Sequence, residues 1–596
     1  MWFAENISWR QFRRSLGAFS AIVCKDGSTV WAEDASGKTI ASGEAGVDDA
    51  EVIQAANDHI ADIGGGVLRI RRGIYYPTTF LELSDYVSVS GEGFCSVLQF
   101  PDLPLLVKMG DYSHLSGLKI AGKIDPLPDP LRQKFLAGNH CIIEKLWIDS
   151  SGYGIETAGK KNVAITNVIL TNIKDNRNWA AAIHSGGDAE NIFIRHFYIE
   201  GCARGIEIDA SPKNIFVEHG YLKDVKQYAG DGDAFSIDVH SHDDQGGADN
   251  IVYRDIVLQN CHGFTAVQTG TGNQTSDYPR NIKFENITLI NPIVSCRIRA
   301  RGISLKHIKI IQENSVNGIE IQRGSRKILI EDFEIDELHG DSYAIKVPHP
   351  DTEDLTIRDC KIIVSSDHET SGHLLYFYGC EGPTKIENVA IINARGWSAI
   401  GLLTCKNVVV KGCKIYVDET NPANYGIWVN ANNVIVENNR IFGAPTTGSI
   451  TVRESAKNVV VTKNIAEKKI YIRNTVENVG VFENVVLGEN IIVESGATNV
   501  RVYKNIGYLT ENSGTETFSG DGSTTDFEIG AHGLVVTDPS KIVVKVTPVS
   551  QDAINASPCV GYVDPADNTK IRVKFASAPA SGTGNVKITW EAQVIS

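Results

Sequence analysis

Acidic and histidine side chains recur at alternate positions of short, strand-like phrases near the middle of the chain. The phrase RGIEIDA carries Glu207 and Asp209, DAFSIDV carries Asp238, and AAAIHSG carries His184. Alternate residues of a strand point to one face, so we expect these side chains to face outward. Stacking of equivalent strands predicts one column of His184, Asp209 and Asp238, spaced about 5 Å apart along the backbone. Glu207 is expected in the neighbouring column, beside Asp209.

This grouping of carboxylates suits cleavage of a glycosidic bond. Carboxylates held so closely repel one another, so at least one is expected to have a raised pKa and to keep its proton near neutral pH. A protonated carboxyl can protonate the leaving oxygen while an ionised one activates water or attacks the anomeric carbon. We predict Asp209, Asp233 and Asp238 as the acid, base or nucleophile, and Glu207 as a further catalytic candidate.

The segment around Asp238 adds more polar groups. The stretch DGDAFSIDVHSHDD supplies Asp233 and His240, and it lies in the longest interval between recurring asparagines, Asn214 to Asn250. Loops on a rigid scaffold tend to carry function. Two other interpretations stay open: an ordinary solvated surface, and metal ligation by the His-Asp-Asp run at 242–244. No recognised loop spacing supports the second, so no metal site is predicted.

Other outward side chains are expected to bind the substrate rather than to react with it. Basic residues would hold an acidic sugar by its carboxylate, and aromatic rings would offer flat apolar faces to sugar rings. The alternative for the aromatic residues is ordinary surface scatter. The predicted substrate-binding set is His184, His240, Gln268, Arg297, Arg299, Glu320, Lys346, Tyr376, Tyr378 and Trp428.

A repeated phrase positions these side chains. An asparagine followed by alternating apolar residues returns as NVAITN at Asn162, NIFVEH at Asn214, NVIVEN at Asn433 and NVRVYKN at Asn499. The same order of short strands recurs each time, so the strands stack in parallel, each on its equivalent one turn earlier. The recurring asparagines would form a ladder of stacked amides at one corner. The sequence therefore predicts an all-β fold, a right-handed parallel β-helix.

The flanking segments complete the expected organisation. Residues 48–63 predict a helix with Ile53, Ala56, Ile60 and Ile63 on one face, placed to cap the first rung. The tail carries hairpin-like strands such as KIVVKVTPVS, which predict a separate β-sandwich. We predict a short N-terminal module over 1–44, the β-helix over 45–508 and a C-terminal β-sandwich accessory domain over 513–596.

The opening of the repeat resembles a known superfamily. The helix at 48–63, Gly64-Gly65-Gly66, the GIYY strand and the SGEG turn at 90–93 resemble pectate-lyase-like right-handed β-helix proteins. That superfamily includes polygalacturonases, polysaccharide lyases and virus tailspikes, and the resemblance covers about residues 45–508. It implies the β-helix fold and, because one scaffold hosts several chemistries, only a general action on polysaccharides.

Three later motifs are similar to those of polygalacturonases. Gly232-Asp233 resembles the family's Asp-Asp, Cys261-His262-Gly263 resembles Gly-His-Gly, and Arg297-Ile298-Arg299 resembles Arg-Ile-Lys. The resemblance implies a catalytic role for His262 and contacts from Arg297 and Arg299 to an acidic sugar. The family's Asn-Thr-Asp position is occupied by Ala203-Arg204-Gly205, which has no acid. Glu207 and Asp209 are the nearest carboxylates.

Composition bounds the function. The chain has 596 residues, with 57 Lys and Arg against 72 Asp and Glu, for a net charge of −15. This acidic balance argues against nucleic-acid binding, and no apolar run reaches the roughly 18 residues of a membrane span. The N-terminal residues, with Arg10, Arg13 and Arg14 before only a short apolar stretch, predict no standard cleaved secretory signal. Eleven cysteines without CxxC pairs fit apolar core positions rather than disulfides or zinc.

The leading functional hypothesis is a glycoside hydrolase that degrades a polysaccharide, extracellular or mounted on a virion. A polysaccharide lyase is the alternative enzyme, with calcium held by Glu207, Asp209 and Asp238 and an enolate stabilised by Arg297, Arg299 or Lys346. No cofactor is required for the hydrolase. A non-catalytic tail fibre or adhesin that binds glycans is the third hypothesis, and a homotrimer is expected for a tailspike-like protein.

Overall fold

The computed structural model describes residues 19–122, 133–150, 152–174, 180–226, 235–241, 246–268, 278–368, 372–488, 490–507, 510–534 and 539–594. The chain divides into two compact units. The first unit runs to residue 368 and includes Cys380–Gly382, and the second comprises the remaining residues from 372 onward. Among the described residues, no helix is long and apolar enough to cross a membrane.

The first unit begins with three antiparallel strands, β1 (Ala21–Asp26), β2 (Thr29–Asp34) and β3 (Thr39–Glu44). β1 also pairs in parallel with β4 (Gly66–Ile70), so these strands continue directly into the first rung. Helix α3 (Asp49–Asp62) follows β3 and buries Ile53, Ala56 and Ile60, as the sequence predicts. Ile63 differs from the prediction, because it is the residue after the last helical turn and is 60% exposed.

The following rungs are built from short strands. They pair in parallel with strands one turn away, for example β4 with β7 and β10 with β12. A single turn of 3-10 helix, η1 (Gly93–Cys95), interrupts them. The strands are β4, β5 (Gly73–Tyr75), β6 (Leu81–Glu82), β7 (Val87–Gly91), β8 (Ser96–Gln99), β9 (Val107–Lys108), β10 (His114–Ala121) and β11 (Gln133–Leu136).

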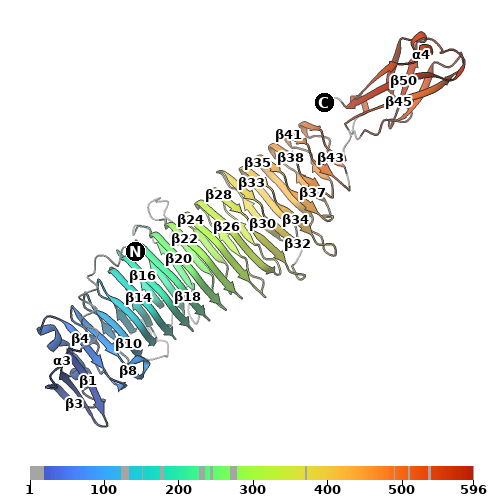
Figure 1. The fold of residues 1–596 in the computed structure, drawn as a ribbon. Coiled ribbons are helices and arrows are strands. Elements are labelled where there is room, and N and C mark those ends of the chain that lie inside the picture. Colours follow the sequence, from blue (N-terminus) through green and yellow to red (C-terminus); the bar gives the residue numbers. More distant parts are fainter. Residues whose placement is uncertain are drawn as a thin grey trace. The chain divides into compact units, whose positions relative to one another are not determined.

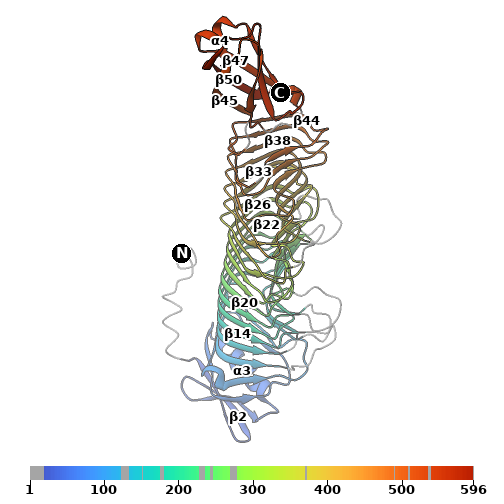
Figure 2. The ribbon, with the colours of Figure 1, turned by 90° about the vertical axis from the view of Figure 1, so that its right-hand side faces the viewer.

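Long strands form one continuous parallel sheet through the rest of the first unit, shown as stacked rungs in Figures 1 and 2. Each pairs with the next long strand of the chain. They are β12 (Ile142–Asp149), β14 (Lys161–Thr171), β16 (Glu190–Glu200), β18 (Lys213–Lys223), β20 (Asp249–Gln259), β22 (Arg280–Ile290), β24 (Arg301–Ile311), β26 (Arg326–Leu338) and β28 (Glu353–Arg358), with β29 (Lys361–Val364) after them.

Shorter strands between the long ones form a second parallel sheet of the same coil. They are β13 (Gly152–Glu156), β15 (Ala181–Ser185), β17 (Arg204–Asp209), β19 (Ile237–Ser241), β21 (Phe264–Gln268), β23 (Cys296–Arg299), β25 (Ile319–Ile321) and β27 (Ile345–Val347). Every strand pairs with its equivalent one turn away, which defines a right-handed parallel β-helix. The predicted fold class is confirmed.

The alternating apolar residues of the repeat fill the inside of the coil. Val163 and Ile165 of β14 and Ile192 and Ile194 of β16 are fully buried, while the residues between them are partly exposed. Burial of each such side chain contributes about 1.5–3 kcal/mol relative to an exposed one. The repeating core thus holds the coil together and directs the intervening side chains outward.

The recurring asparagines form the expected ladder. Asn162, Asn191, Asn214 and Asn250 all adopt a left-handed backbone conformation with φ of 57–58°, which asparagine tolerates better than most residues. Their side-chain amides donate in sequence, each Nδ2 to the preceding Oδ1, at 3.0, 3.1 and 2.7 Å. Asn281 leaves the series and donates to Asp249 instead. The corner is therefore fixed both by backbone conformation and by stacked hydrogen bonds.

The second unit also contains a coil of short parallel strands. Its strands are β30 (His373–Tyr378), β31 (Thr384–Glu387), β32 (Ala390–Ala394), β33 (Ser398–Lys411), β34 (Lys414–Val417), β35 (Tyr425–Glu437), β36 (Arg440–Phe442), β37 (Gly448–Val452), β38 (Lys457–Thr462), β39 (Ile465–Ala466), β40 (Ile470–Ile472), β41 (Glu477–Phe482), β42 (Val485–Val486), β43 (Ile491–Val493) and β44 (Thr498–Tyr503). A second, buried asparagine ladder runs through Asn439, Asn464 and Asn484.

Two three-stranded antiparallel sheets end the chain. One has the order β45-β50-β47 and the other β46-β49-β48. Their inner faces share one apolar core that includes Ile571, Val573, Val586 and Ile588, which confirms the predicted β-sandwich. Its elements are β45 (Glu511–Gly520), β46 (Asp526–Ala531), η2 (Pro539–Lys541), β47 (Ile542–Pro548), α4 (Gln551–Asn555), β48 (Cys559–Val563), β49 (Lys570–Phe575) and β50 (Gly582–Val594).

Candidate functional site

The short strands of the first unit bring the predicted acids together, in a different register from the one expected. Glu207 on β17 pairs with His184 on β15 and with Asp238 on β19. Asp209 pairs instead with His240. The predicted column of His184, Asp209 and Asp238 is therefore wrong by two residues on β17. A shift of two residues leaves every side chain on its predicted face, so alternation in the sequence does not detect it.

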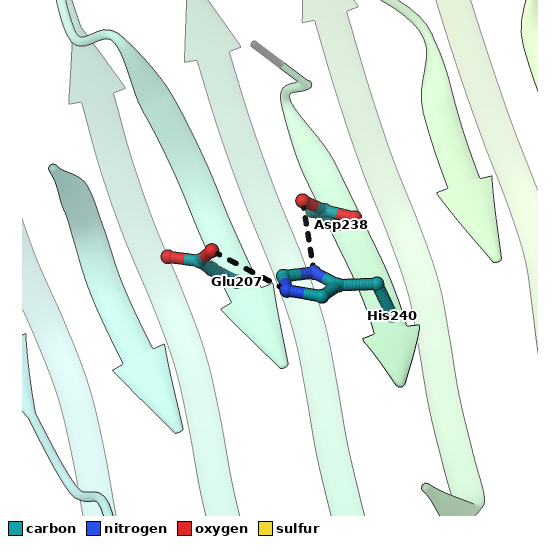
Figure 3. A group of neighbouring side chains, drawn as sticks. All are labelled: Glu207, Asp238 and His240. Atoms are coloured by element: carbon teal, nitrogen blue, oxygen red, sulfur yellow. Dashed lines mark ion pairs between the residues drawn. The ribbon is translucent and has the colours of Figure 1, made fainter. Parts of the chain in front are cut away.

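His240 lies among three carboxylates. Its Nδ1 is 3.2 Å from Asp238 Oδ2, and its Nε2 is 3.2 Å from Asp209 Oδ1 and 3.9 Å from Glu207 Oε1. Figure 3 shows the imidazole between Asp238, on the same strand, and Glu207, on the neighbouring strand. From the sequence, His240 is expected only to bind the substrate, whereas the structure places it at the centre of the cluster.

Arg204 is the functional candidate that sequence reasoning missed. It opens β17, and its guanidinium forms an ion pair with Glu207 and lies 3.7 Å from Asp238 Oδ2. The Arg204 side chain is only 12% exposed, so its charge is largely shielded from water. One signal in the sequence could have identified Arg204, because it stands where polygalacturonases carry an acid. Acids follow it three and five positions later, at Glu207 and Asp209, which indicates that a basic residue and the acids exchange places along this strand.

Burial and the surrounding charges set the protonation of this cluster. Burial raises the pKa of Glu207, against the opposing effect of Arg204 and His240. The cause is mainly desolvation and only to a small extent repulsion by Asp238, in contrast to the expectation from the sequence. Burial disfavours the charged form of His240, but Asp238, Glu207 and Asp209 outweigh it and raise its pKa to about 9. His240 is therefore a cation at neutral pH.

His184 continues the column on the neighbouring turn. Its Nδ1 lies 3.7 Å from Glu156 Oε1, and Lys134 Nζ lies 3.5 Å from the other oxygen of that carboxylate. Burial opposes the charged form of each side chain. The ion pair between them nevertheless raises the pKa of His184, and together with Lys134 it lowers the pKa of Glu156. Acidic and basic side chains thus lie next to each other in this part of the column.

The predicted basic residues lie further along the same column. Thr265 occupies the position next to Asp238, and Arg297 pairs with Thr265, so Arg297 is two rungs from Asp238 as expected. The Arg297 guanidinium lies 5.6 Å from the centre of the Phe235 ring. Arg299 lies 5.9 Å from that of Tyr278. Aromatic rings beside a guanidinium favour its charge and restrict its orientation.

Two further predicted side chains close this column. Glu320 pairs with Arg297, and Lys346 pairs with Glu320. Gln322 donates a long hydrogen bond of 3.5 Å to Glu320, while Lys346 Nζ lies 4.6 Å from the centre of the Tyr343 ring. Both residues share the outward face with Arg297, as the sequence predicts. Their roles in binding a substrate stay predictions.

Three predicted residues are less well defined. Asp233 lies outside the described residues, and so does the side chain of Gln268, whose backbone ends β21. His262 precedes β21 and forms an isolated bridge with Val294. Its backbone N–H donates to Val225, and its carbonyl accepts a hydrogen bond from Ser236. A catalytic role for His262 remains a prediction from the motif.

The predicted aromatic residues belong to the second unit, where Tyr376 and Trp428 each stack on His373. The His373 ring lies 5.0 Å from that of Tyr376 and 5.4 Å from that of Trp428. Gly401 makes room for the His373 ring, because a Cβ at position 401 would lie 2.5 Å from His373 Nδ1. Trp428 is only 7% exposed, so the expectation that it offers an open face to a sugar is wrong. Tyr378 is 36% exposed.

Glu207, Asp238 and His240 form the only group among the described residues that has the spacing of a metal site. One ligand atom each of Glu207, Asp238 and His240 lie within 4.8 Å of one another. Calcium takes six to eight oxygen ligands. Here Arg204 contacts both carboxylates, and His240 supplies an imidazole nitrogen in place of an oxygen. The residues present do not fit the calcium site considered for a lyase.

No protein-family model and no curated protein matches this chain. Among solved structures, the tailspike protein gp49 from Pseudomonas phage LKA1 aligns over 91% of this chain and 92% of its own, with 12% identity and a TM-score of 0.35. A mutant tailspike of E. coli bacteriophage HK620 in complex with a pentasaccharide aligns over 94% and 92%, with 13% identity and a TM-score of 0.35.

A third similar structure is an enzyme module. The A-module of mannuronan C-5 epimerase AlgE6 from Azotobacter vinelandii aligns over 77% of this chain and 96% of its own, with 16% identity and a TM-score of 0.23. These proteins share the parallel β-helix. All three TM-scores lie below 0.5, so the chemistry of the site is argued from its own geometry.

Proposed function

We propose that this protein hydrolyses glycosidic bonds of a polysaccharide at the cluster of Glu207, Asp238 and His240. The observation that carries the proposal is that two carboxyl groups in unlike environments lie close together. Their nearest ligand oxygens are within 4.8 Å, and Glu207 is 5% exposed with a pKa raised by burial. Asp238 instead lies 3.2 Å from a protonated imidazole, which favours its ionised form.

These environments assign the two roles. Glu207, which holds its proton to higher pH, protonates the oxygen of the leaving sugar. Asp238, kept ionised by His240, attacks the anomeric carbon, and Glu207 then activates the water that releases the product. The carboxyl separation is nearer to the roughly 5 Å of retaining enzymes than to the 6.5–9.5 Å of inverting ones, so we propose retention of configuration. Asp209 anchors the other nitrogen of His240.

A lyase is less well supported by this geometry. It would need a neutral or basic group to remove the proton next to a uronate carboxylate. His240, the imidazole nearest to the carboxylates, has a pKa of about 9 and is protonated at neutral pH. The imidazole is therefore not available as that base, and the cluster instead offers the acid and the ionised carboxylate that glycoside hydrolysis uses.

The charges further along the column suggest which glycan is bound. Arg297 and Arg299 lie on the rung two turns from Asp238 and carry fixed positive charge. A guanidinium pairs well with a planar carboxylate. We include in the proposal that the substrate contains an acidic sugar and that it contacts these arginines at some distance from the cleaved bond.

A panel of acidic and neutral polysaccharides tests the proposal. New reducing ends should appear with at least one acidic polymer, without the ultraviolet absorbance of an unsaturated uronate. Glu207→Gln and Asp238→Asn should each reduce kcat by about 1,000-fold. Glu285→Gln is the matched control and should retain activity. Glu285 is a carboxylate on β22, in the sheet of long strands, and forms an ion pair with Arg254.

Two results would contradict the proposed roles. Full activity of both active-site variants would place the chemistry elsewhere, and an unsaturated product would indicate a lyase. Proton NMR of the first-formed product then distinguishes retention from inversion. The proposal also keeps the expected setting, a trimer mounted on a virus particle, and light scattering on the purified chain would contradict it by giving a monomer mass.

A further inference from the structure

A groove lies on the first unit away from the carboxylate cluster. It has a volume of about 550 Å³ and is lined by residues at the ends of the long strands β12, β14, β16 and β18. The carboxylate cluster instead lies on β17 and β19, the short strands that follow β16 and β18. The volume falls in the range of small-molecule sites. The two sites therefore occupy different sheets of the same turns.

Hydrogen bonds hold one wall of the groove in place. Asp149 Oδ1 accepts hydrogen bonds from Thr171 Oγ1 at 2.9 Å and from Asn172 Nδ2 at 2.8 Å. Trp147 Nε1 donates to Thr171 Oγ1 at 3.0 Å. Lys119 lies 3.5 Å from Asp149 and 3.7 Å from the centre of the Trp147 ring. These polar and aromatic groups are positioned before any ligand arrives.

Two further carboxylates line the groove. Glu200 accepts hydrogen bonds from Tyr198 at 2.7 Å and from Lys223 at 2.6 Å. Its side chain is 36% exposed, and that of Asp224, 3.9 Å from Lys223 Nζ, is 34% exposed. A carboxylate has about four acceptor positions, so Glu200 retains capacity for hydroxyl donors from a ligand.

The charges of the groove balance. Its carboxylates are Asp149, Glu200 and Asp224, and the neighbouring ammonium groups are Lys119, Lys223 and Lys226. Lys226 is exposed and has no ion pair within the described parts of the chain. The groove's carboxylates do not reach the spacing of a metal site, which among described residues only the Glu207 group attains. The groove thus suits a neutral ligand larger than an ion.

We infer that this groove binds a neutral sugar unit of a polysaccharide. Sugar hydroxyls donate to the fixed carboxylates, the Lys226 ammonium donates to sugar oxygens, and the Trp147 ring packs against apolar C–H groups. Because the charges of the groove balance, an acidic sugar gains no net attraction here, in contrast to the arginines near Asp238. This inference does not depend on whether the carboxylate cluster cleaves glycans.

The test measures binding in a variant that cannot cleave. The double variant Glu207→Gln/Asp238→Asn is titrated by calorimetry and saturation-transfer NMR with cellobiose, maltose and lactose, and with digalacturonate as the acidic probe. At least one neutral disaccharide should bind. Adding Glu200→Gln or Asp224→Asn should weaken it about tenfold, as expected for the loss of one hydrogen bond to a charged group.

Glu334→Gln is the matched control. This carboxylate also accepts hydrogen bonds from a lysine, Lys361 at 2.9 Å, but it lies outside the groove, so its substitution should leave binding unchanged. The inference is overturned if no neutral disaccharide binds, if binding is insensitive to Glu200→Gln and Asp224→Asn, or if digalacturonate binds in a manner that depends on these two residues. Cleavage by the wild-type chain is a separate readout that reports only on the carboxylate cluster.

Discussion

His240 Nδ1 lies 3.2 Å from Asp238 Oδ2, on the same strand and two residues away. Alternate residues of a strand share a face, so this contact is local and depends little on neighbouring turns. The other nitrogen of the ring reaches Asp209, on the preceding turn of the coil. One imidazole therefore joins a carboxylate of its own strand to carboxylates of the preceding turn, and several measurable properties follow from this arrangement.

The first prediction concerns Arg204. Arg204→Met removes the cation that contacts Glu207 and Asp238, so the pKa values of both carboxyls should rise. The pH profile of kcat/KM on the cleaved glycan should then move to higher pH by about one unit. Arg204→Lys, which restores a cation, should move it less. A profile unchanged in Arg204→Met would show that this guanidinium does not control the proton positions.

The second prediction concerns the charge of His240. Its pKa in the folded protein is about 9, above its ordinary value of 6.5. Its contribution to the free energy of unfolding is therefore complete below about pH 6.5 and disappears as the pH rises through 9. The loss amounts to about 3 kcal/mol. Denaturation at pH 6, 8 and 10 should show this loss in the wild type and a smaller one in His240→Gln.

Equal pH dependence in both proteins would mean that His240 is not held as a cation. His219→Gln is the matched control, because this exposed histidine lies 3.2 Å from a single carboxylate, Asp255. Its replacement should leave the dependence between pH 8 and 10 as it is in the wild type.

The third prediction has the opposite sign and concerns the second unit. Burial lowers the pKa of His373 to about 4, below its ordinary value of 6.5. The stabilising effect is therefore complete above pH 6.5 and is lost as the pH falls through 4, by about 3 kcal/mol. His373→Phe keeps a ring between Tyr376 and Trp428 and should reduce the acid sensitivity. An equally acid-sensitive variant would refute this assignment.

The fourth prediction compares the two asparagine ladders. Asn464 is fully buried and donates to Val436 O and Asn484 Oδ1, both at 2.9 Å. Asn464→Ala leaves buried groups without partners and should lower the free energy of unfolding by about 3–5 kcal/mol. Asn458→Ala, which removes an exposed amide that donates to Asn433 Oδ1 at 2.9 Å in the same kind of corner ladder as Asn162, should cost only about 1–2 kcal/mol. Similar losses in denaturant titrations of the two variants would contradict this distinction.

Much of the fold was predictable because its signals are local and repeated. Alternating apolar residues after Asn162 and Asn214 define strands and their buried faces, and asparagine tolerates the left-handed corner conformation. Repetition of the same order leaves parallel stacking as the consistent arrangement. The predicted helix at 48–63 needed only its own periodicity, and it begins and ends within one residue of α3.

The site was predictable only in part. The sequence alone determined which side chains face outward, including Glu207, Asp209, Asp238 and Arg297, because that depends on period-two alternation. The tertiary structure decided which of them meet, since a shift of two residues between turns preserves every face yet pairs Glu207 with Asp238 and Asp209 with His240.

The structure also decided the environment of each side chain. Arg204 contacts two carboxylates because β17 begins beside them, and Trp428 is covered because Gly401 admits the His373 ring. Burial and pKa depend on neighbours from other turns, which alternation along one strand does not specify. The sequence thus determined the coil and its outward residues, while packing between turns determined the chemistry of the site.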